Sequence, residues 1–481
     1  MNYGIVIKIL GSILIIESML MTPSLMISLS LREESVYAFL NTIIITLLIG
    51  LIFKYIPKSK STIKAKEGLA IVTIGWIVMS LFGALPFYLS NSTPTYIDAL
   101  FETVSGFTTT GSSVISNVEA LSKGILFWRS FTHWIGGMGI LVFTLALLPA
   151  LGIGGVHIFK AESPGPVAGK IVPRLKDTAR ILYVSYISIT ILEILFLKLG
   201  GLSIFEAMTH TFSTVGTGGF GVRNDSITSY NSYVHVVISI FMVLSGMNFS
   251  LHFTLYKRKF KEFYLDEELR LYIKFIVVSI ILIVINLLFT IYDDIWLAIR
   301  DSFFQVGSIM TTTGFSTVDF DLWPTFSKMI LLVLMFIGGS AGSTAGGMKV
   351  IRILIVFKSI KQGLSKIFHP RAYIPIKVGG RTVSNEVIER VNSFLALHII
   401  VFIVATLFIS LEGVDLVTSI SSVAATLNNI GPGLSLVGPT KTYYEFSQWS
   451  KLLFSALMLM GRLELFTVIA LIVPNSWTRE S

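Results

Sequence analysis

Three Thr- and Gly-rich segments of this chain have a spacing that is suited to coordinating a dehydrated cation. Each segment ends in a glycine (Gly111, Gly219 or Gly314), with an acidic residue thirteen positions before it and a serine six positions before it. Glycine permits the backbone angles that turn carbonyl groups inward, and rings of carbonyl oxygens replace the hydration shell of the ion in K⁺ channels. The candidate chemistry is therefore ion coordination by backbone oxygens and not a covalent reaction.

A fourth segment extends the pattern. Residues 428–431, Asn-Asn-Ile-Gly, keep the glycine and the helix-like run before it but lack the acid and the serine. The four glycines are 108, 95 and 117 residues apart, and each lies between two apolar stretches. The pattern predicts four units of outer helix, short helix, turn and inner helix. The acid (Asp98, Glu206 or Asp301) is expected near the start of the short helix, where it meets the positive end of the helix dipole.

We expect these four segments, here called the filter turns (residues 108–111, 216–219, 311–314 and 428–431), to converge on one axis. One such turn alone would more often be a tight connection, whereas four in register favour an ion pathway. Irregular backbone is tolerated at membrane depth only where it is buried in protein or lines water. The candidate filter residues are Thr109, Thr110, Gly111, Thr217, Gly218, Gly219, Thr312, Thr313, Gly314, Asn429, Ile430 and Gly431.

Transmembrane helices are the elements that must position these turns. Hydrophobic residues make up 53% of the 481 residues and charged residues only 14%, against about a quarter charged in a typical soluble protein. This composition excludes soluble enzymes, nucleic-acid-binding proteins and disordered scaffolds. The absence of cysteine excludes disulfides, thiol catalysis and Cys-based metal sites. Ten stretches are long enough to cross the hydrocarbon core, near residues 4–30, 36–56, 67–90, 124–150, 178–200, 232–256, 270–291, 327–357, 391–411 and 447–473.

The distribution of Lys and Arg predicts the orientation of the chain. Residues 54–66, 157–180, 257–274 and 358–390 carry five, five, six and seven of them, whereas the intervening connections carry one or two each. Because cytoplasmic loops carry the excess of Lys and Arg, both termini are expected in the cytoplasm. The net charge of +9 is then mostly an inward-facing surface and not a patch for nucleic acid.

Residues 338–347 interrupt an apolar stretch with ten small residues, of which five are glycine. Each glycine costs about 1 kcal/mol of helix propensity relative to alanine, so this segment is expected to unwind. A small-residue face for helix packing is one alternative. A phosphate-binding loop is disfavoured, because Lys349 is one place late and no Ser or Thr follows it. The favoured interpretation is a flexible intramembrane loop beneath the filter turns.

Arg462 lies about fifteen residues into the last apolar stretch. An ionised side chain at the bilayer centre costs about 2.5–3.5 kcal/mol on insertion scales and normally faces a cavity or a partner. Snorkelling to the cytoplasmic surface is the alternative to a position facing the pore. The seven His residues are scattered without ligand spacing, which disfavours metal or triad chemistry. Arg129 and His133 are interpreted as structural.

These motifs resemble those of the superfamily of K⁺ transporters that includes TrkH, KtrB and fungal Trk proteins. The extra N-terminal helix pair and the length are most similar to the TrkH type. The resemblance covers essentially the whole chain, and its most specific pieces are residues 108–111, 311–317, 428–433 and 338–347.

The resemblance implies a single-chain pore that passes K⁺, a homodimer in the lipid bilayer of the bacterial inner membrane, and a cytoplasmic TrkA-type nucleotide-binding ring that gates it. K⁺ would be the transported ion, with no organic cofactor and no enzymatic activity. It also implies that the intramembrane loop forms the gate together with Arg462, which makes the candidate gate residues Gly338, Gly339, Gly342, Gly346, Gly347 and Arg462.

The expected fold is an all-α polytopic membrane protein, with two peripheral N-terminal helices and four helix–pore-loop–helix repeats around a pseudo-fourfold pore. Its expected parts are the helix pair 1–60 and the repeats 61–156, 157–258, 259–368 and 369–481.

The expected function is K⁺ uptake down an electrochemical gradient, without a chemical step. One alternative is an H⁺- or Na⁺-coupled symporter, which the carboxylates inside spans (Glu17, Glu193 and Glu464) would support. Another is a membrane-embedded hydrolase, which the dispersed His and Ser residues disfavour. The second and fourth filter turns differ from Thr-Thr-Thr-Gly, which leaves strict discrimination of K⁺ from Na⁺ open.

Overall fold

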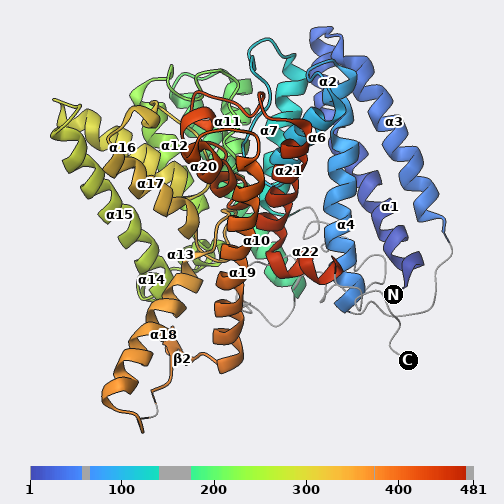
Figure 1. Ribbon diagram of the computed structural model, residues 1–481. Coiled ribbons are helices and arrows are strands. Elements are labelled where there is room, and N and C mark those ends of the chain that lie inside the picture. The colour runs from blue at the N-terminus through green and yellow to red at the C-terminus, as the bar shows by residue number, and fades with distance from the viewer. Residues whose placement is uncertain (1, 57–64, 140–174, 373, 473–481) are drawn as a thin grey trace.

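The computed structural model describes residues 2–56, 65–139, 175–372 and 374–472, which are mostly helical (Figure 1). The one sheet in these residues pairs β1 (Lys377–Val378) antiparallel with β2 (Arg381–Thr382). Six described helices are long and apolar enough to cross a membrane, and two bent helix pairs bring the number to eight. Of the other two predicted spans, 124–150 runs on beyond the described residues, and 327–357 is interrupted as predicted.

The N-terminal helices form a pair at one side of the molecule (Figure 1). They are α1 (Tyr3–Leu20), α2 (Thr22–Leu31) and α3 (Ser35–Lys54), with α1 and α2 forming one span. A Cβ atom on Gly11 would lie 2.6 Å from the carbonyl oxygen of Gly50, so α1 and α3 touch backbone to backbone. The carboxylate of Glu33 accepts hydrogen bonds of 2.7 Å and 3.0 Å from the N–H groups of Lys123 and Gly124, which attaches the pair to the first repeat.

Four repeats follow, each with an outer helix, a short pore helix and an inner helix. The outer helices are α4 (Ala65–Gly83), α10 (Leu175–Leu199), α15 (Glu267–Leu288) and α19 (Asn385–Ser410). The pore helices are α6 (Tyr96–Phe107), α11 (Ile204–Val215), α16 (Ile295–Met310) and α20 (Leu416–Leu427). The inner helices are α7 (Lys123–Gly137), α12 (Ser232–Ser245), α17 (Thr325–Ile337) and α21 (Gln448–Leu463). The shorter or peripheral helices are α5 (Leu85–Leu89), α13 (Phe249–Tyr256), α14 (Phe260–Tyr264), α18 (Val350–Phe368) and α22 (Leu465–Ile472), with 3₁₀ turns η2 (Phe320–Leu322) and η3 (Ser435–Val437).

Each pore helix begins at a polar residue whose side chain accepts a hydrogen bond from the first turn; these N-caps are Thr95, Ser203, Asp294 and Asp415. The predicted acids Asp98 and Glu206 lie in the first turn of their helices. The prediction was wrong for Asp301, because α16 begins six residues earlier, at Ile295, and Asp294 is its cap. The predicted boundaries 60/61 and 156/157 lie outside the described residues.

The fourth repeat lacks the aligned acid but has a negative charge at its helix start. Asp415 accepts a 3.0 Å hydrogen bond from the N–H of Thr418. Burial opposes the ionisation of this carboxyl, but hydrogen bonds from Thr418 and Ser435 outweigh it and hold the pKa of Asp415 below its ordinary value. A capping acid therefore replaces an acid inside the first turn.

The inner helices are interrupted more often than the sequence suggested. α12 bends by 98° into α13, and α21 bends by 114° into α22 at Glu464, which has a positive φ of 65°. α17 ends at Ile337, and helix resumes only at Val350. The predicted spans at 232–256 and 447–473 therefore each contain a bend that the sequence analysis did not predict.

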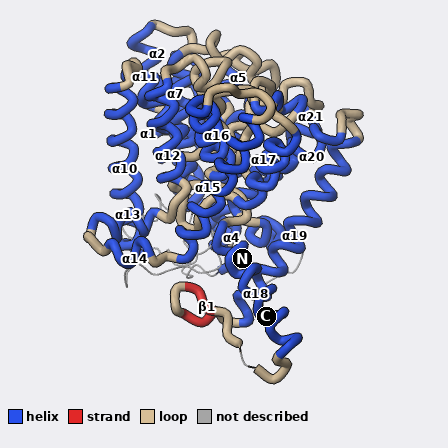
Figure 2. The backbone as a smooth tube through the Cα atoms, turned by 90° about the vertical axis from the view of Figure 1, so that its left-hand side faces the viewer, coloured by secondary structure: helices blue, strands red, loops and turns tan. Residues whose placement is uncertain are grey.

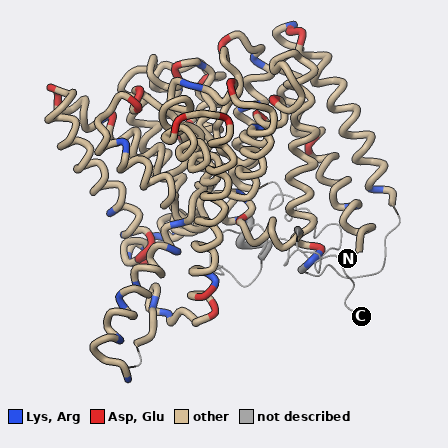
Figure 3. Tube along the Cα trace, viewed as in Figure 1, with Lys and Arg blue, Asp and Glu red and all other residues tan. Residues whose placement is uncertain are grey.

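Charged residues gather at the two ends of the molecule, and the band between them is mostly uncharged (Figure 3). This distribution is the one that a bilayer requires, because charges at the bilayer centre are costly. α18 and the β1–β2 hairpin project beyond this band at one end (Figure 2). The basic segment 358–390 is therefore displayed outside the helical bundle.

Candidate functional site

The four filter turns have the same backbone conformation. The residue two positions before the glycine has a positive φ of 56° in every turn, at Thr109, Thr217, Thr312 and Asn429. The glycines at the end of the turns have φ values of 82°, 77°, 87° and 100°. A positive φ is uncommon for residues other than glycine and is strained for a β-branched residue such as threonine. Three threonines in this conformation, at equivalent positions, indicate a backbone that its surroundings hold in one shape.

One backbone hydrogen bond, also repeated four times, ties each turn to its pore helix. The N–H of the residue before the glycine donates to the carbonyl oxygen five residues earlier. The pairs are Thr110 to Ser105 (2.9 Å), Gly218 to Ser213 (2.7 Å), Thr313 to Ser308 (2.8 Å) and Ile430 to Ala425 (2.9 Å). Because the main chain makes this bond, the bond does not depend on the serine side chain, and alanine takes that position in the fourth repeat.

Each filter glycine faces a carbonyl group of the next turn. A Cβ atom added to Gly111, Gly219, Gly314 or Gly431 would lie 2.0, 2.1, 2.1 or 2.8 Å from the carbonyl oxygen of Gly218, Thr313, Ile430 or Thr110, respectively. The contacts run from repeat 1 to 2, 3 and 4 and then return to repeat 1. The four turns therefore surround a common axis, and the glycines leave no room for side chains between neighbouring turns.

The same glycines line one cavity of about 160 Å³. Polar groups line it as well, among them the side chains of Arg129, Arg223 and Lys441. All twelve predicted filter residues thus belong to one cluster of turns beneath this cavity. The structure brings them together as the fourfold pattern predicts, and the convergence of their carbonyl oxygens on a bound ion stays a prediction.

The loop at 338–347 lies directly against the filter turns. The N–H of Gly346 donates a 2.6 Å hydrogen bond to the hydroxyl of Thr312, and the N–H of Gly347 donates a 3.0 Å bond to the carbonyl of Asn428. The hydroxyl of Thr344 donates to the carbonyl of Val215 at 3.0 Å, at the end of the second pore helix. The loop therefore contacts the second, third and fourth repeats and crosses beneath the turns.

Three of the candidate gate glycines have positive φ values, namely Gly338 (73°), Gly342 (73°) and Gly347 (75°). A side chain at Gly346 would lie 2.4 Å from the carbonyl oxygen of Asn428, and one at Gly339 would meet Ala345 at 2.5 Å. The glycines thus serve backbone conformation and close approach. The alternative of a helix-packing face is wrong, because the segment is not helical.

Arg462 reaches the same place from the inner helix of the fourth repeat. Its guanidinium donates hydrogen bonds to the carbonyl of Thr344 (2.7 Å), the carbonyl of Gly137 (2.9 Å) and the hydroxyl of Thr109 (3.3 Å). It also donates to the carbonyl of Gly136. The side chain therefore points toward the filter turns and does not snorkel to the surface.

Acidic residues hold the loop and the inner-helix breaks, and the sequence analysis did not identify these roles. The carboxylate of Glu268, on α15, accepts from the N–H groups of Ala341 (2.7 Å) and Ile351 (3.2 Å), one inside the loop and one just after it. Glu464 forms an ion pair of 2.6 Å with Arg352. The sequence signal for both was an acidic residue next to or inside an apolar stretch.

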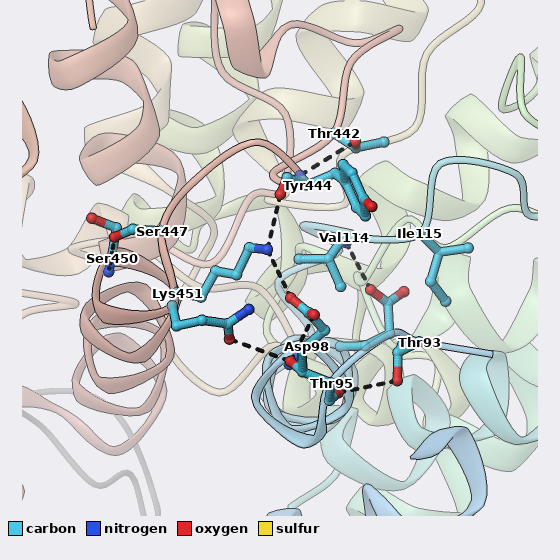
Figure 4. Close-up of polar contacts among 12 residues, drawn as sticks. Thr93, Thr95, Asp98, Val114, Ile115, Thr442, Tyr444, Ser447, Ser450 and Lys451 are labelled. Atoms are coloured by element: carbon cyan, nitrogen blue, oxygen red, sulfur yellow. Dashed lines mark hydrogen bonds and ion pairs between the residues drawn. The ribbon is translucent and has the colours of Figure 1, made fainter. Parts of the chain in front are cut away.

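A buried ion pair joins the first repeat to the fourth, and the sequence analysis did not identify it either. The ammonium of Lys451, on α21, lies 2.7 Å from the carboxylate of Asp98, on α6, and also donates to the carbonyl of Tyr444 at 2.9 Å (Figure 4). Arg129, which lines the cavity above the filter turns, pairs with Glu102 at 2.6 Å.

Comparison with known proteins gives the same architecture. The model of the TrkH family, described as a cation transport protein, matches residues 35–479. The chain is 38% identical to the Trk system potassium uptake protein TrkH of Salmonella typhimurium, over 99% of this chain and 100% of that protein. It is 36% identical to the protein of the same name from Halomonas elongata, over 100% of both. The crystal structure of the potassium transporter TrkH from Vibrio parahaemolyticus matches with a TM-score of 0.89 and 35% identity, over 99% of this chain and 100% of that chain.

Proposed function

The chain belongs to the TrkH family of cation transport proteins, and from this premise we propose that it mediates the uptake of potassium ions through one channel-like pore. The observation that carries the proposal is the closed series of contacts between the four filter glycines and the carbonyl groups of the neighbouring turns. Relatives along the whole chain are named potassium uptake proteins, which supports K⁺ as the ion.

The filter turns supply what the passage of a dehydrated cation needs. An ion that loses its water must find oxygen ligands at once, and backbone carbonyl groups in rings provide them without a titratable group. The four turns differ in sequence but have the same backbone geometry, as their similar φ values indicate. The work of the protein is dehydration, replacement of water by carbonyl oxygens and gating, with no chemical step.

The structure supports a closed gate beneath the turns. Residues 338–347 cross the axis region, and Arg462 places a positive charge next to Thr109. A cation leaving the turns toward the cytoplasm would meet backbone atoms and a like charge. Opening therefore requires that the loop and Arg462 move away.

We propose that a cytoplasmic nucleotide-binding ring drives this movement, that the protein is a homodimer in the bacterial inner membrane, and that both termini are cytoplasmic. The projecting α18 supports a docking role, because it exposes apolar side chains such as Ile360, Leu364 and Ile367 outside the bundle. The exposed basic residues of the same arm fit a partner with an acidic face.

Coupling to H⁺ or Na⁺ is the second candidate, and the site favours it less. The residues that line the cavity above the filter turns include no Asp or Glu. Glu17 and Glu193 are fully buried in α1 and α10, and Glu464 is paired with Arg352. Passive conduction therefore needs fewer assumptions than symport.

The decisive experiment is uptake of ⁸⁶Rb⁺ into proteoliposomes that contain the purified protein, with and without an imposed membrane potential, and with and without the proposed nucleotide-binding partner. A potential-driven uptake that K⁺ competes for is expected. Uptake that requires a pH or Na⁺ gradient would favour symport, and the absence of uptake under every condition would overturn the proposal.

A further inference from the structure

The second filter turn lacks a side chain that the other three have. The residue before the filter glycine is Thr110, Thr313 or Ile430 in repeats 1, 3 and 4, but it is Gly218 in repeat 2. Those three side chains are fully buried. The hydroxyl of Thr110 lies 2.8 Å from that of Thr108, and the hydroxyl of Thr313 lies 2.7 Å from that of Thr311.

The backbone of Gly218 does not require glycine. Gly219 has a positive φ of 77°, whereas Gly218 is not among the residues with positive φ. Its N–H also makes the same bond to the pore helix as its counterparts. A different neighbour must therefore exclude a side chain there.

That neighbour is His133, on the inner helix of the first repeat. A Cβ atom on Gly218 would lie 1.4 Å from Nδ1 and 2.1 Å from Cε1 of His133, so the imidazole ring occupies the place of the missing side chain. The ring is fully buried, and its centroid lies 4.2 Å from the ring centroid of Phe220, which is two residues after Gly218 in the chain.

The same helix, α7, also contacts the other residues of the segment 216–221. The carbonyl oxygen of His133 would lie 2.5 Å from a Cβ atom on Gly216, so the backbones of the helix and the turn touch. One helical turn earlier, Arg129 donates a 3.0 Å hydrogen bond to the carbonyl of Gly221 and lies 3.5 Å over the ring of Phe220. The helix thus contacts residues 216–221 from one end to the other.

We propose that His133 is a positioning residue of the ion filter, which holds the second turn in place by filling the volume that a side chain at position 218 fills in the other repeats. Neither ring nitrogen has a hydrogen-bond partner among the described residues, so the ring acts through its volume. Protein interiors are close-packed, and a void next to a backbone segment lets that segment shift. The inference rests on the proposed function, because it concerns the selectivity of the same turns.

The test is a pair of complementary substitutions, His133→Ala and Gly218→Ala, made singly and together. The readout is the ratio of ⁸⁶Rb⁺ to ²²Na⁺ uptake into proteoliposomes, together with the melting temperature of the purified protein. His133→Ala should lower the ratio about tenfold by loosening the turn, and Gly218→Ala should lower it through the clash with the ring. The double variant should lie closer to the parent than either single variant does, because the new methyl group enters the space that the ring vacates.

A third variant separates volume from stability. His133→Leu restores most of the volume and should lose much less of the ratio than His133→Ala does. Strictly additive losses in the double variant, an unchanged ratio in His133→Ala, or equal losses for His133→Leu and His133→Ala would each overturn the inference. If the parent itself takes up no ⁸⁶Rb⁺, the proposed function fails instead, so the two failures are distinguishable.

Discussion

The guanidinium of Arg462 donates a 2.7 Å hydrogen bond to the carbonyl oxygen of Thr344, in the middle of the intramembrane loop. The two residues come from different repeats, Arg462 from the fourth and Thr344 from the third. Arg462 also contacts the first repeat through Gly137, and Thr344 contacts the second repeat through Val215. The loop and the charge therefore form one obstacle, and removing either should weaken the other.

Arg462→Ala should raise the basal ⁸⁶Rb⁺ flux in the absence of any partner, on the order of tenfold. Two like charges about 4 Å apart repel by about 4 kcal/mol at an effective dielectric constant of 20, and water that enters the space screens part of this. Arg462→Lys keeps the charge and serves as the control. Deletion of residues 340–345 should open the path sterically. Parent-level flux in both Arg462→Ala and the deletion, with normal membrane insertion, would place the gate elsewhere.

Gly314→Val should abolish or degrade K⁺ selectivity. A side chain at Gly314 would meet the carbonyl oxygen of Ile430 at 2.1 Å, and its φ of 87° is strained for any β-branched residue. Gly363→Val is the matched control, because nothing lies within 4 Å of a Cβ atom there. If Gly314→Val conducts K⁺ and excludes Na⁺ as the parent does, the filter assignment fails.

The sequence predicted the parts of this site that depend on a repeated pattern. Glycines at equal register indicated turns of equal geometry, and the φ values at Gly111, Gly219, Gly314 and Gly431 agree. The sequence also indicated the unwound loop, because five glycines in ten residues do not sustain a helix.

Features that depend on contacts between distant residues could not be predicted in this way. The break at Glu464 is one such feature, because Glu464 pairs with Arg352, which is 112 residues away. The role of His133 likewise depends on its position beside Gly218, which only the fold creates.

Glu268→Ala should also raise the basal flux without a partner, by about tenfold. The carboxylate holds the N–H groups of Ala341 and Ile351, and hydrogen bonds to charged groups contribute about 1.5–3 kcal/mol each. Glu268→Gln retains an acceptor oxygen and should have a smaller effect. Glu267→Ala is the neighbouring control, since Glu267 pairs with Lys358 and not with the loop. A flux in Glu268→Ala no higher than in Glu267→Ala would show that the carboxylate does not hold the gate.

Neutralising Lys361, Lys366 and Arg371 together should weaken the binding of the cytoplasmic partner, and more so at low salt than at high salt. All three are exposed on the projecting arm, and salt at 0.1 M largely screens interactions between exposed charges that are more than about 10 Å apart. The control is a second basic triple, Lys257, Arg258 and Lys261, which is exposed on the connection around α14. Equal losses for the two triples would indicate a diffuse charge effect, and unchanged binding at every salt concentration would remove the arm from the interface.

Asp98→Asn and Lys451→Met should each destabilise the protein by about 3 kcal/mol or more, because removing one partner of a buried ion pair leaves an uncompensated charge. The two side chains are only 1% and 4% exposed, and the pair joins the pore helix of the first repeat to the inner helix of the fourth. The double variant should recover part of the loss, since neither charge then remains buried alone. Lys259→Met, in an ion pair with Glu262 whose side chains are 52% and 59% exposed, should cost no more than about 1 kcal/mol. Melting temperatures in detergent measure all four variants, and a cost at Asp98 as small as that at Lys259 would mean that this ion pair contributes little to holding the first and fourth repeats together.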